Sequence, residues 1–155
     1  MKKVIIYSDG ASKGNPGDAG IGVVISDADG KVLREVADYI GKQTNNVAEY
    51  AALIRGLKEA ADLGATQVEI RTDSELLARQ LTGVYKVKAP NLIPLFEELI
   101  SLLRVFERAS VTHVMREGNK RADKLANEGI RRHRNAQIKP APAALPKKGQ
   151  GKLGL

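Results

Sequence analysis

Four acidic residues, far apart in the chain, form a set that could bind divalent metal ions: Asp9, Glu49, Asp73 and Asp123. Carboxylates gathered in a partly buried place repel one another, which raises their pKa values unless a cation neutralises them. Oxygen ligands of this kind suit hard cations, above all Mg²⁺. If the fold brings the four together, they predict two-metal chemistry on a phosphodiester. Taken singly, each acid has a plainer interpretation as a turn residue or a helix N-terminal residue.

The segments that carry these acids have the pattern of an α/β domain. Short apolar runs bounded by turn residues predict five strands, at residues 4–7, 20–26, 31–40, 67–72 and 111–115. Apolar residues at helical spacing, with capping residues before them, predict four helices, at residues 47–63, 75–81, 92–106 and 120 to about 130. Hairpin links join the first three strands, and helices join the others.

This order of elements predicts a five-stranded mixed sheet with strand order 3-2-1-4-5 and helices on its faces. The two hairpins make strand 2 antiparallel to its neighbours, and the helical crossovers make strands 4 and 5 parallel to strand 1. The carboxyl ends of strands 1, 3, 4 and 5 then meet at one edge. All four acids follow those ends, so the topology predicts that they converge where open α/β sheets bind ligands.

Composition narrows the class of protein. The chain of 155 residues has no cysteine and only two histidines, His113 and His133, which excludes disulfides and thiolate metal sites. The N-terminal apolar stretch has too few residues for a signal peptide, and no stretch of the sequence approaches the roughly 20 apolar residues of a membrane span. We therefore expect a cytoplasmic protein without a membrane association, and we infer no obligate protein partner.

The positive charge is concentrated at the C-terminal end. Residues 131–155 hold seven basic residues and no acid, so the remaining 18 basic residues balance the 18 acidic ones within residues 1–130. Prolines and glycines in the same stretch argue against packed structure. We therefore expect a folded domain at 1–130 and a flexible basic tail at 131–155. The tail is either an arm for a polyanion or a solvated terminus.

Four stretches carry a resemblance to a known family: YSDGASKGNPGDAGIG, TNNVAEYAALIRGL, IRTDSELLARQL and HVMREGNKRADKLAN. In order and spacing, from about Val4 to Glu128, they resemble the successive motifs of type 1 ribonuclease H. The chain looks most like the compact prokaryotic forms that lack the basic protrusion, because only Val84–Pro90 joins the second and third predicted helices. The tail from Arg131 lies outside the resemblance.

The resemblance implies an endonuclease that hydrolyses the RNA strand of RNA–DNA hybrids and leaves 3′-hydroxyl and 5′-phosphate ends. It implies two Mg²⁺ ions, for which Mn²⁺ could substitute. By the family pattern Asp9 bridges both ions and Asp123 helps to hold the ion that activates water. Glu49 and Asp73 hold the ion at the leaving 3′-oxygen.

The same resemblance assigns substrate contacts to five further residues. Asn15 and Asn45 match positions that contact the minor groove, where 2′-hydroxyls are displayed. Thr44 and Asn46 match a pocket for a phosphate of the DNA strand, next to a helix N-terminus. Asn119 matches an asparagine four residues before the last acid. All five residue types are also usual in turns and helix caps, and both interpretations can hold together.

Two departures from the family pattern affect the expected site. Better-known members have a mobile histidine before the last acid, whereas this chain has Arg116-Glu117-Gly118, so either Glu117 takes that place or product release is slower. A glutamine often follows the Asp-Ser pair, but here Glu75 would put a negative charge near RNA. Lys13 is a candidate phosphate contact, although exposed lysines are usually only solvated.

Two other functions are compatible with these motifs. One is a non-catalytic nucleic-acid-binding module on the same fold, against which the presence of all four acids argues. The other is a nuclease that also cuts double-stranded RNA, which the missing basic protrusion leaves open because fewer positive contacts would select the hybrid.

Overall fold

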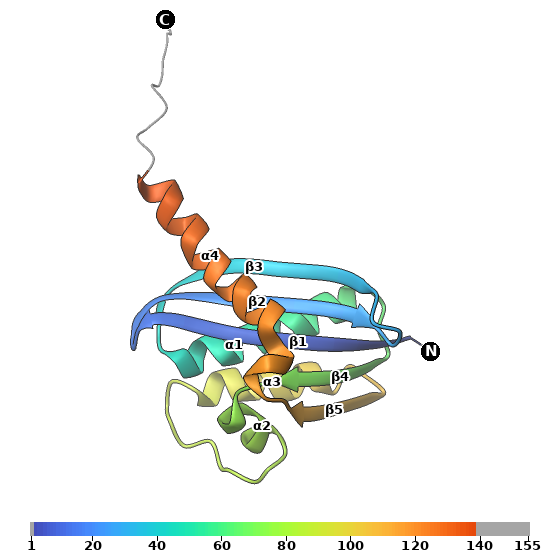
Figure 1. Ribbon diagram of the computed structural model, residues 1–155. Helices are drawn as coiled ribbons and strands as arrows, with labels where there is room; N and C mark the ends of the chain where they lie inside the picture. The colour runs from blue at the N-terminus through green and yellow to red at the C-terminus, as the bar shows by residue number, and fades with distance from the viewer. Residues whose placement is uncertain (1, 139–155) are drawn as a thin grey trace, which may run out of the picture.

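The protein is described by a computed structural model that covers residues 2–138. Its centre is a single five-stranded sheet ordered β3-β2-β1-β4-β5, as the sequence predicted (Figure 1). The strands are β1 (Lys3–Gly14), β2 (Gly17–Asp27), β3 (Val32–Gln43), β4 (Gln67–Thr72) and β5 (Arg108–His113). β2 is antiparallel to both of its neighbours, whereas β1, β4 and β5 run parallel.

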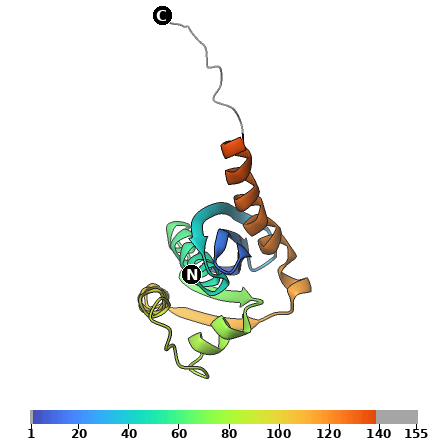
Figure 2. The ribbon, with the colours of Figure 1, turned by 90° about the vertical axis from the view of Figure 1, so that its left-hand side faces the viewer.

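Helices cover both faces of the sheet. They are α1 (Asn45–Asp62), α2 (Glu75–Leu81), α3 (Ile93–Leu103), the short 3-10 helix η1 (Arg116–Asn119) and α4 (Lys120–Ile138). α1 packs on β1 and β2 from one side, and α4 packs on β2 and β3 from the other (Figure 2). No helix within residues 2–138 is long and apolar enough to cross a membrane.

The core lies between the sheet and α1. Val4 and Ile6 of β1 point to this side, as the alternation of a strand requires, and both are completely buried. Leu53 and Leu57 of α1 meet them, and they are also fully buried. This packing fixes α1, and with it the acids near the start of α1, against the central strand.

Only β4 has the predicted bounds among the five strands, and the differences are largest for β1 and β5. We expected β1 to end near Tyr7 and a loop to follow, but β1 continues to Gly14. Its pairing with β4 ends at Ser8, whereas its pairing with β2 continues to the hairpin turn. The polar residues after Tyr7 are therefore held by ladder hydrogen bonds that local composition does not reveal. β5 begins and ends earlier than predicted, because its ladder with β4 runs from Arg108, opposite Gln67, to His113, opposite Thr72.

The predicted boundary between domain and tail is also wrong in part. α4 does not stop near Ile130 but continues to Ile138, so the first eight residues assigned to the tail are helical. His133 and Arg134 in this stretch contact β3 and β2. Tertiary contacts thus extend a helix whose own sequence has few apolar residues in this part. The predicted tail from residue 139 onward lies outside the described residues.

Candidate active site

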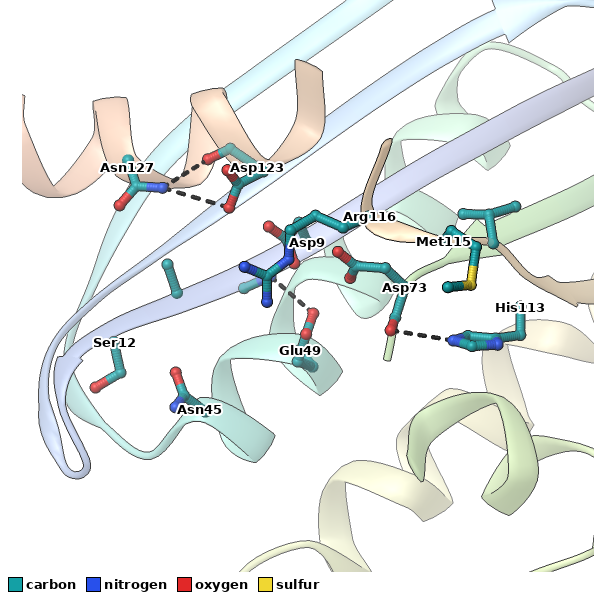
Figure 3. A pocket seen from close by; sticks show the side chains of 13 residues that line it. Asp9, Ser12, Asn45, Glu49, Asp73, His113, Met115, Arg116, Asp123 and Asn127 are labelled. Carbon is teal, nitrogen blue, oxygen red and sulfur yellow. Dashed lines mark hydrogen bonds between the residues drawn. The ribbon is translucent and has the colours of Figure 1, made fainter. Parts of the chain in front are cut away.

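All four acids predicted from the sequence line one cleft of about 490 Å³ (Figure 3). Asp9 lies on β1, Glu49 in α1, Asp73 directly after β4 and Asp123 in the first turn of α4. Carboxylate oxygens of Asp9, Glu49 and Asp73 lie within 4.8 Å of one another. Asp123 faces Asp9 from the α4 side of the same cleft and lies outside this close group (Figure 3).

Asp9 is placed where β1 loses its parallel neighbour. The residue before it still pairs with Thr72 of β4, so Asp9 stands at the first position where the sheet edge opens. Its side chain is only 4% exposed. The next residue, Gly10, lies so close to α1 that a Cβ atom there would be 2.2 Å from the carbonyl carbon of Ala48. This close approach lets the Gly10 N–H donate to Glu49 Oε1 at 2.8 Å.

Asp73 is held through its backbone by β5. Val114 donates its N–H to the carbonyl of Thr72 at 2.9 Å. His113 Nε2 lies 3.3 Å from the carbonyl oxygen of Asp73, to which it donates. After Asp73, Ser74 caps α2 by accepting from Leu77 N–H at 3.2 Å. The turn that carries the carboxylate is therefore fixed on both sides.

The α4 side of the cleft is anchored by two asparagines. Asn119 is 1% exposed, and its Nδ2 donates to the Ser8 carbonyl at 2.9 Å, which ties η1 to the residue before Asp9. Asn127, one turn after Asp123, donates to the Asp123 carbonyl at 2.9 Å. Asn119 is almost completely buried in this structure, and its side-chain bond holds η1 on β1, while the nucleic-acid contact that we expected for it stays a prediction.

The electrostatics of the cleft favour a bound cation. Burial, reinforced by the charge of Glu49 and by hydrogen bonding with Asp123, raises the pKa of Asp9 to about 10. Burial also raises the pKa of Glu49 to about 8, against the opposing effect of the Gly10 hydrogen bond. Two carboxylates that resist ionisation together, with all-oxygen donors around them, form a site that a divalent cation would stabilise.

Of the expected substrate contacts, Asn45 is among the residues that line the cleft, whereas Asn15, Thr44, Asn46 and Asn119 are not. The backbone N–H of Asn45 donates to the side-chain oxygen of Asn15 at 3.1 Å. Thr44 caps α1 by accepting from Val47 N–H at 3.2 Å, so the cap interpretation holds for this residue. Asn46 and Lys13 are exposed.

Comparison with known proteins identifies the family. A family model described as "Reverse transcriptase-like" matches residues 7–129. The chain is 47% identical over 128 residues to the Ribonuclease HI of Halobacterium salinarum. This alignment covers 83% of this chain and 64% of the relative. The crystal structure of RNase H1 from that archaeon superposes with a TM-score of 0.82 at 46% identity, covering 84% of this chain and 98% of the other. The chain belongs to the ribonuclease H family.

A second ribonuclease H relative was solved with a nucleic acid. It is LC11-RNase H1 in complex with RNA/DNA hybrid, which matches with a TM-score of 0.81 at 47% identity and covers 84% of this chain and 98% of that one. The family prediction from the four motifs is therefore confirmed. The present chain spans 64% of the length of the halobacterial Ribonuclease HI.

The ribonuclease H cleft also contains residues that the sequence reasoning did not single out for the site. Arg116 extends from η1 into the cleft beside the carboxylates, whereas its neighbour Glu117, to which we gave an accessory role, is not among the lining residues (Figure 3). His113, Met115 and Asn127 line it as well. Arg116 lay in the loop that departs from the family pattern, and that departure was the only sequence signal for it.

Proposed function

We propose that this protein is an endoribonuclease that hydrolyses the RNA strand of RNA–DNA hybrids, leaving 3′-hydroxyl and 5′-phosphate ends. The observation that carries the proposal is the carboxylate group of Asp9, Glu49 and Asp73, whose oxygens lie within 4.8 Å of one another at the sheet edge. The hybrid bound to LC11-RNase H1, a relative that this chain matches over nearly its whole length, supports the same substrate.

Divalent cations fit this donor set. The cleft offers carboxylate oxygens without a thiol, and burial together with mutual repulsion raises the pKa values of Asp9 and Glu49, which a bound cation would offset. We assign one Mg²⁺ to Asp9, Glu49 and Asp73 and a second to Asp9 and Asp123, with Mn²⁺ as a substitute. Bound cations would lower the pKa of the attacking water and neutralise charge on the leaving oxygen.

The chain's own residues provide orientation. The Gly10 N–H holds the Glu49 carboxylate, and His113 holds the turn of Asp73. Asn119 holds η1 on β1, which directs Arg116 into the cleft. A guanidinium beside the carboxylates is suited to bind a phosphate oxygen through paired N–H groups. We therefore assign Arg116 to orienting the phosphate that is cut.

We assign recognition of the hybrid to the start of α1 and to the neighbouring β1–β2 hairpin. Asn15 keeps its side-chain Nδ2 as a donor after its oxygen accepts from Asn45, so both residues can contact 2′-hydroxyls in the minor groove. Thr44 and Asn46 stand at the N-terminus of α1, where the positive end of the helix dipole favours a phosphate. Lys13 would add a phosphate contact from the hairpin.

The test is a cleavage assay on three labelled duplexes: RNA–DNA hybrid, double-stranded RNA and double-stranded DNA. Each is incubated with Mg²⁺, Mn²⁺ or a chelator, and the product ends are mapped. We expect hybrid cleavage with either metal and none with chelator. Asp9→Asn should abolish cleavage and leave hybrid binding largely intact, because a metal ligand is lost without a groove contact. A wild-type rate for Asp9→Asn would contradict the two-metal assignment, and binding without cleavage by the wild type would favour the non-catalytic module.

A further inference from the structure

The last turns of α4 are fastened to the β1–β2 hairpin and to β3 by four side chains. Arg134 Nε donates to Asp18 Oδ2 at 3.1 Å, and the Tyr39 hydroxyl donates to Asp18 Oδ1 at 3.0 Å. The rings of Tyr39 and His133 stack with centroids 3.6 Å apart and planes 5° from parallel. We call Asp18, Tyr39, His133 and Arg134 the α4 clasp. It joins three elements that are separate in sequence.

The hairpin held by this clasp is also tied to the loop before α1. Asn45 N–H donates to Asn15 Oδ1 at 3.1 Å, and Ser12 Oγ donates to the carbonyl of Gln43 at 2.9 Å. The two segments that we assign to the minor groove are thus one unit, joined to each other and to the end of α4. A displacement of the hairpin would carry Asn15 and Asn45 with it.

α4 connects this unit to the carboxylate cluster. Asp123 lies in the first turn of the helix, and Arg134 follows eleven residues later, which corresponds to about 16 Å along a helix axis at roughly 1.5 Å per residue. The helix packs closely on the sheet, because Gly22 has no side chain there: a Cβ atom at this position would lie 2.0 Å from the Ala122 carbonyl oxygen. In Figure 1, α4 is the orange helix that crosses the sheet and projects past β3.

We propose that the α4 clasp consists of positioning residues that set the distance between the carboxylate cluster and the groove-contacting unit, and thereby select which phosphodiester of a bound hybrid is cut. This inference rests on the proposed function. The bond that breaks is the one at the carboxylates, while the unit of Asn15 and Asn45 determines how the duplex is seated. If the two move relative to each other, the same bound duplex presents a different phosphate.

The four side chains could instead serve stability alone. If the clasp only stabilises the fold, its loss should lower the melting temperature but leave the cut position and KM of the folded enzyme unchanged. If the clasp positions the site, its loss should change the cut position and KM, while kcat of the folded enzyme stays the same. The two roles therefore predict different results for the same variants.

The experiment compares Arg134→Met with Arg132→Met. Arg132 lies two residues earlier, is also exposed, and pairs with Glu128 of its own helix, so this variant loses the same charge without removing a hydrogen bond or ring contact of the clasp. Arg134→Lys tests rescue by a retained charge, and Tyr39→Phe removes the hydroxyl bond and keeps the ring. Each variant cuts one end-labelled hybrid of defined sequence whose RNA lies in a short block. The cut positions, kcat and KM are measured below the melting temperature of every variant.

For Arg134→Met and Tyr39→Phe we expect KM to rise about threefold to tenfold, kcat to stay within about twofold, and the cuts to spread to neighbouring phosphodiesters. Arg132→Met should behave as wild type, and Arg134→Lys should restore much of the original cut pattern. Unchanged KM and cut positions in Arg134→Met, or equal effects in Arg132→Met, would overturn the proposal. Failure of the wild type to cut the hybrid at all would overturn the proposed function, and the role of the clasp with it.

Discussion

The backbone N–H of Gly10 donates to the carboxylate of Glu49 at 2.8 Å, although 39 residues separate the two in sequence. This bond joins the strand that carries Asp9 to the helix that carries Glu49. It exists because Gly10 has no side chain to hold α1 away. The distance between two carboxylates of the cluster thus depends on one missing Cβ atom.

Gly10→Ala should therefore damage both stability and activity. The new Cβ would lie 2.2 Å from the carbonyl carbon of Ala48, so α1 must shift away from β1. We expect a loss of about 1–3 kcal/mol in the free energy of unfolding and a large loss of cleavage, measured by denaturant unfolding and by the hybrid assay. Gly118→Ala is the control for stability, because its Cβ would meet ordinary contacts at 3.5 Å. Equal unfolding free energies for the two variants would contradict this packing argument.

The metal-free protein should lose stability as the pH rises. The pKa of Asp9 is raised from 3.8 to about 10 and that of Glu49 from 4.5 to about 8. At a pH between the ordinary and the raised pKa values, these two carboxyls stay protonated in the native state but are ionised in the unfolded chain. The protonated carboxyls therefore stabilise the native state fully below about pH 4, and this stabilisation declines as the pH rises. In chelator, the melting temperature should fall between about pH 5 and pH 9.

Asp9→Asn tests the origin of that decline. The amide cannot ionise, so the variant should be more stable than the wild type in chelator at high pH, and its melting temperature should depend less on pH. Mg²⁺ should stabilise the wild type more at high pH than at low pH, because protons compete for the same oxygens. A wild type and variant with parallel pH profiles in chelator would show that these carboxylates do not cause the decline.

Substitutions of the neighbours Arg116 and Glu117 should differ in their effect on cleavage. Arg116 lines the cleft and Glu117 does not. Arg116→Met should lower kcat/KM on the hybrid by about tenfold to a hundredfold, the range of one lost charge-assisted contact to phosphate. Glu117→Gln should remain near the wild-type value in the same assay. The reverse order of effects would restore Glu117 as the accessory residue that the sequence suggested.

The basic residues after α4 can be tested apart from the clasp. Deletion of residues 139–155 removes four lysines and keeps His133 and Arg134. If these lysines contact phosphates, hybrid affinity should fall at low salt, and the slope of log affinity against log salt should become shallower by roughly 0.9 per lost contact. Turnover at saturating hybrid should stay the same. An unchanged slope on truncation would leave residues 139–155 without a role in binding.

Local sequence signals determined most of the elements. The alternation in 67–72 and the Ser74 cap correspond to β4 and the start of α2 at the predicted residues. Hairpin and crossover lengths then determined the strand order, since short links require antiparallel neighbours and helical links allow parallel ones. From that order the convergence of Asp9, Glu49, Asp73 and Asp123 on one cleft followed without coordinates.

Contacts between distant segments decided the rest. The burial of Asn119 depends on the Ser8 carbonyl, 111 residues away, and the length of α4 depends on β2 and β3 residues that its own sequence does not contain. The direction of Arg116 depends on how η1 is held on β1. A sequence pattern reports the preferences of neighbours along the chain, whereas these side chains are placed by partners that only the folded chain brings near, and so only the tertiary structure could assign them.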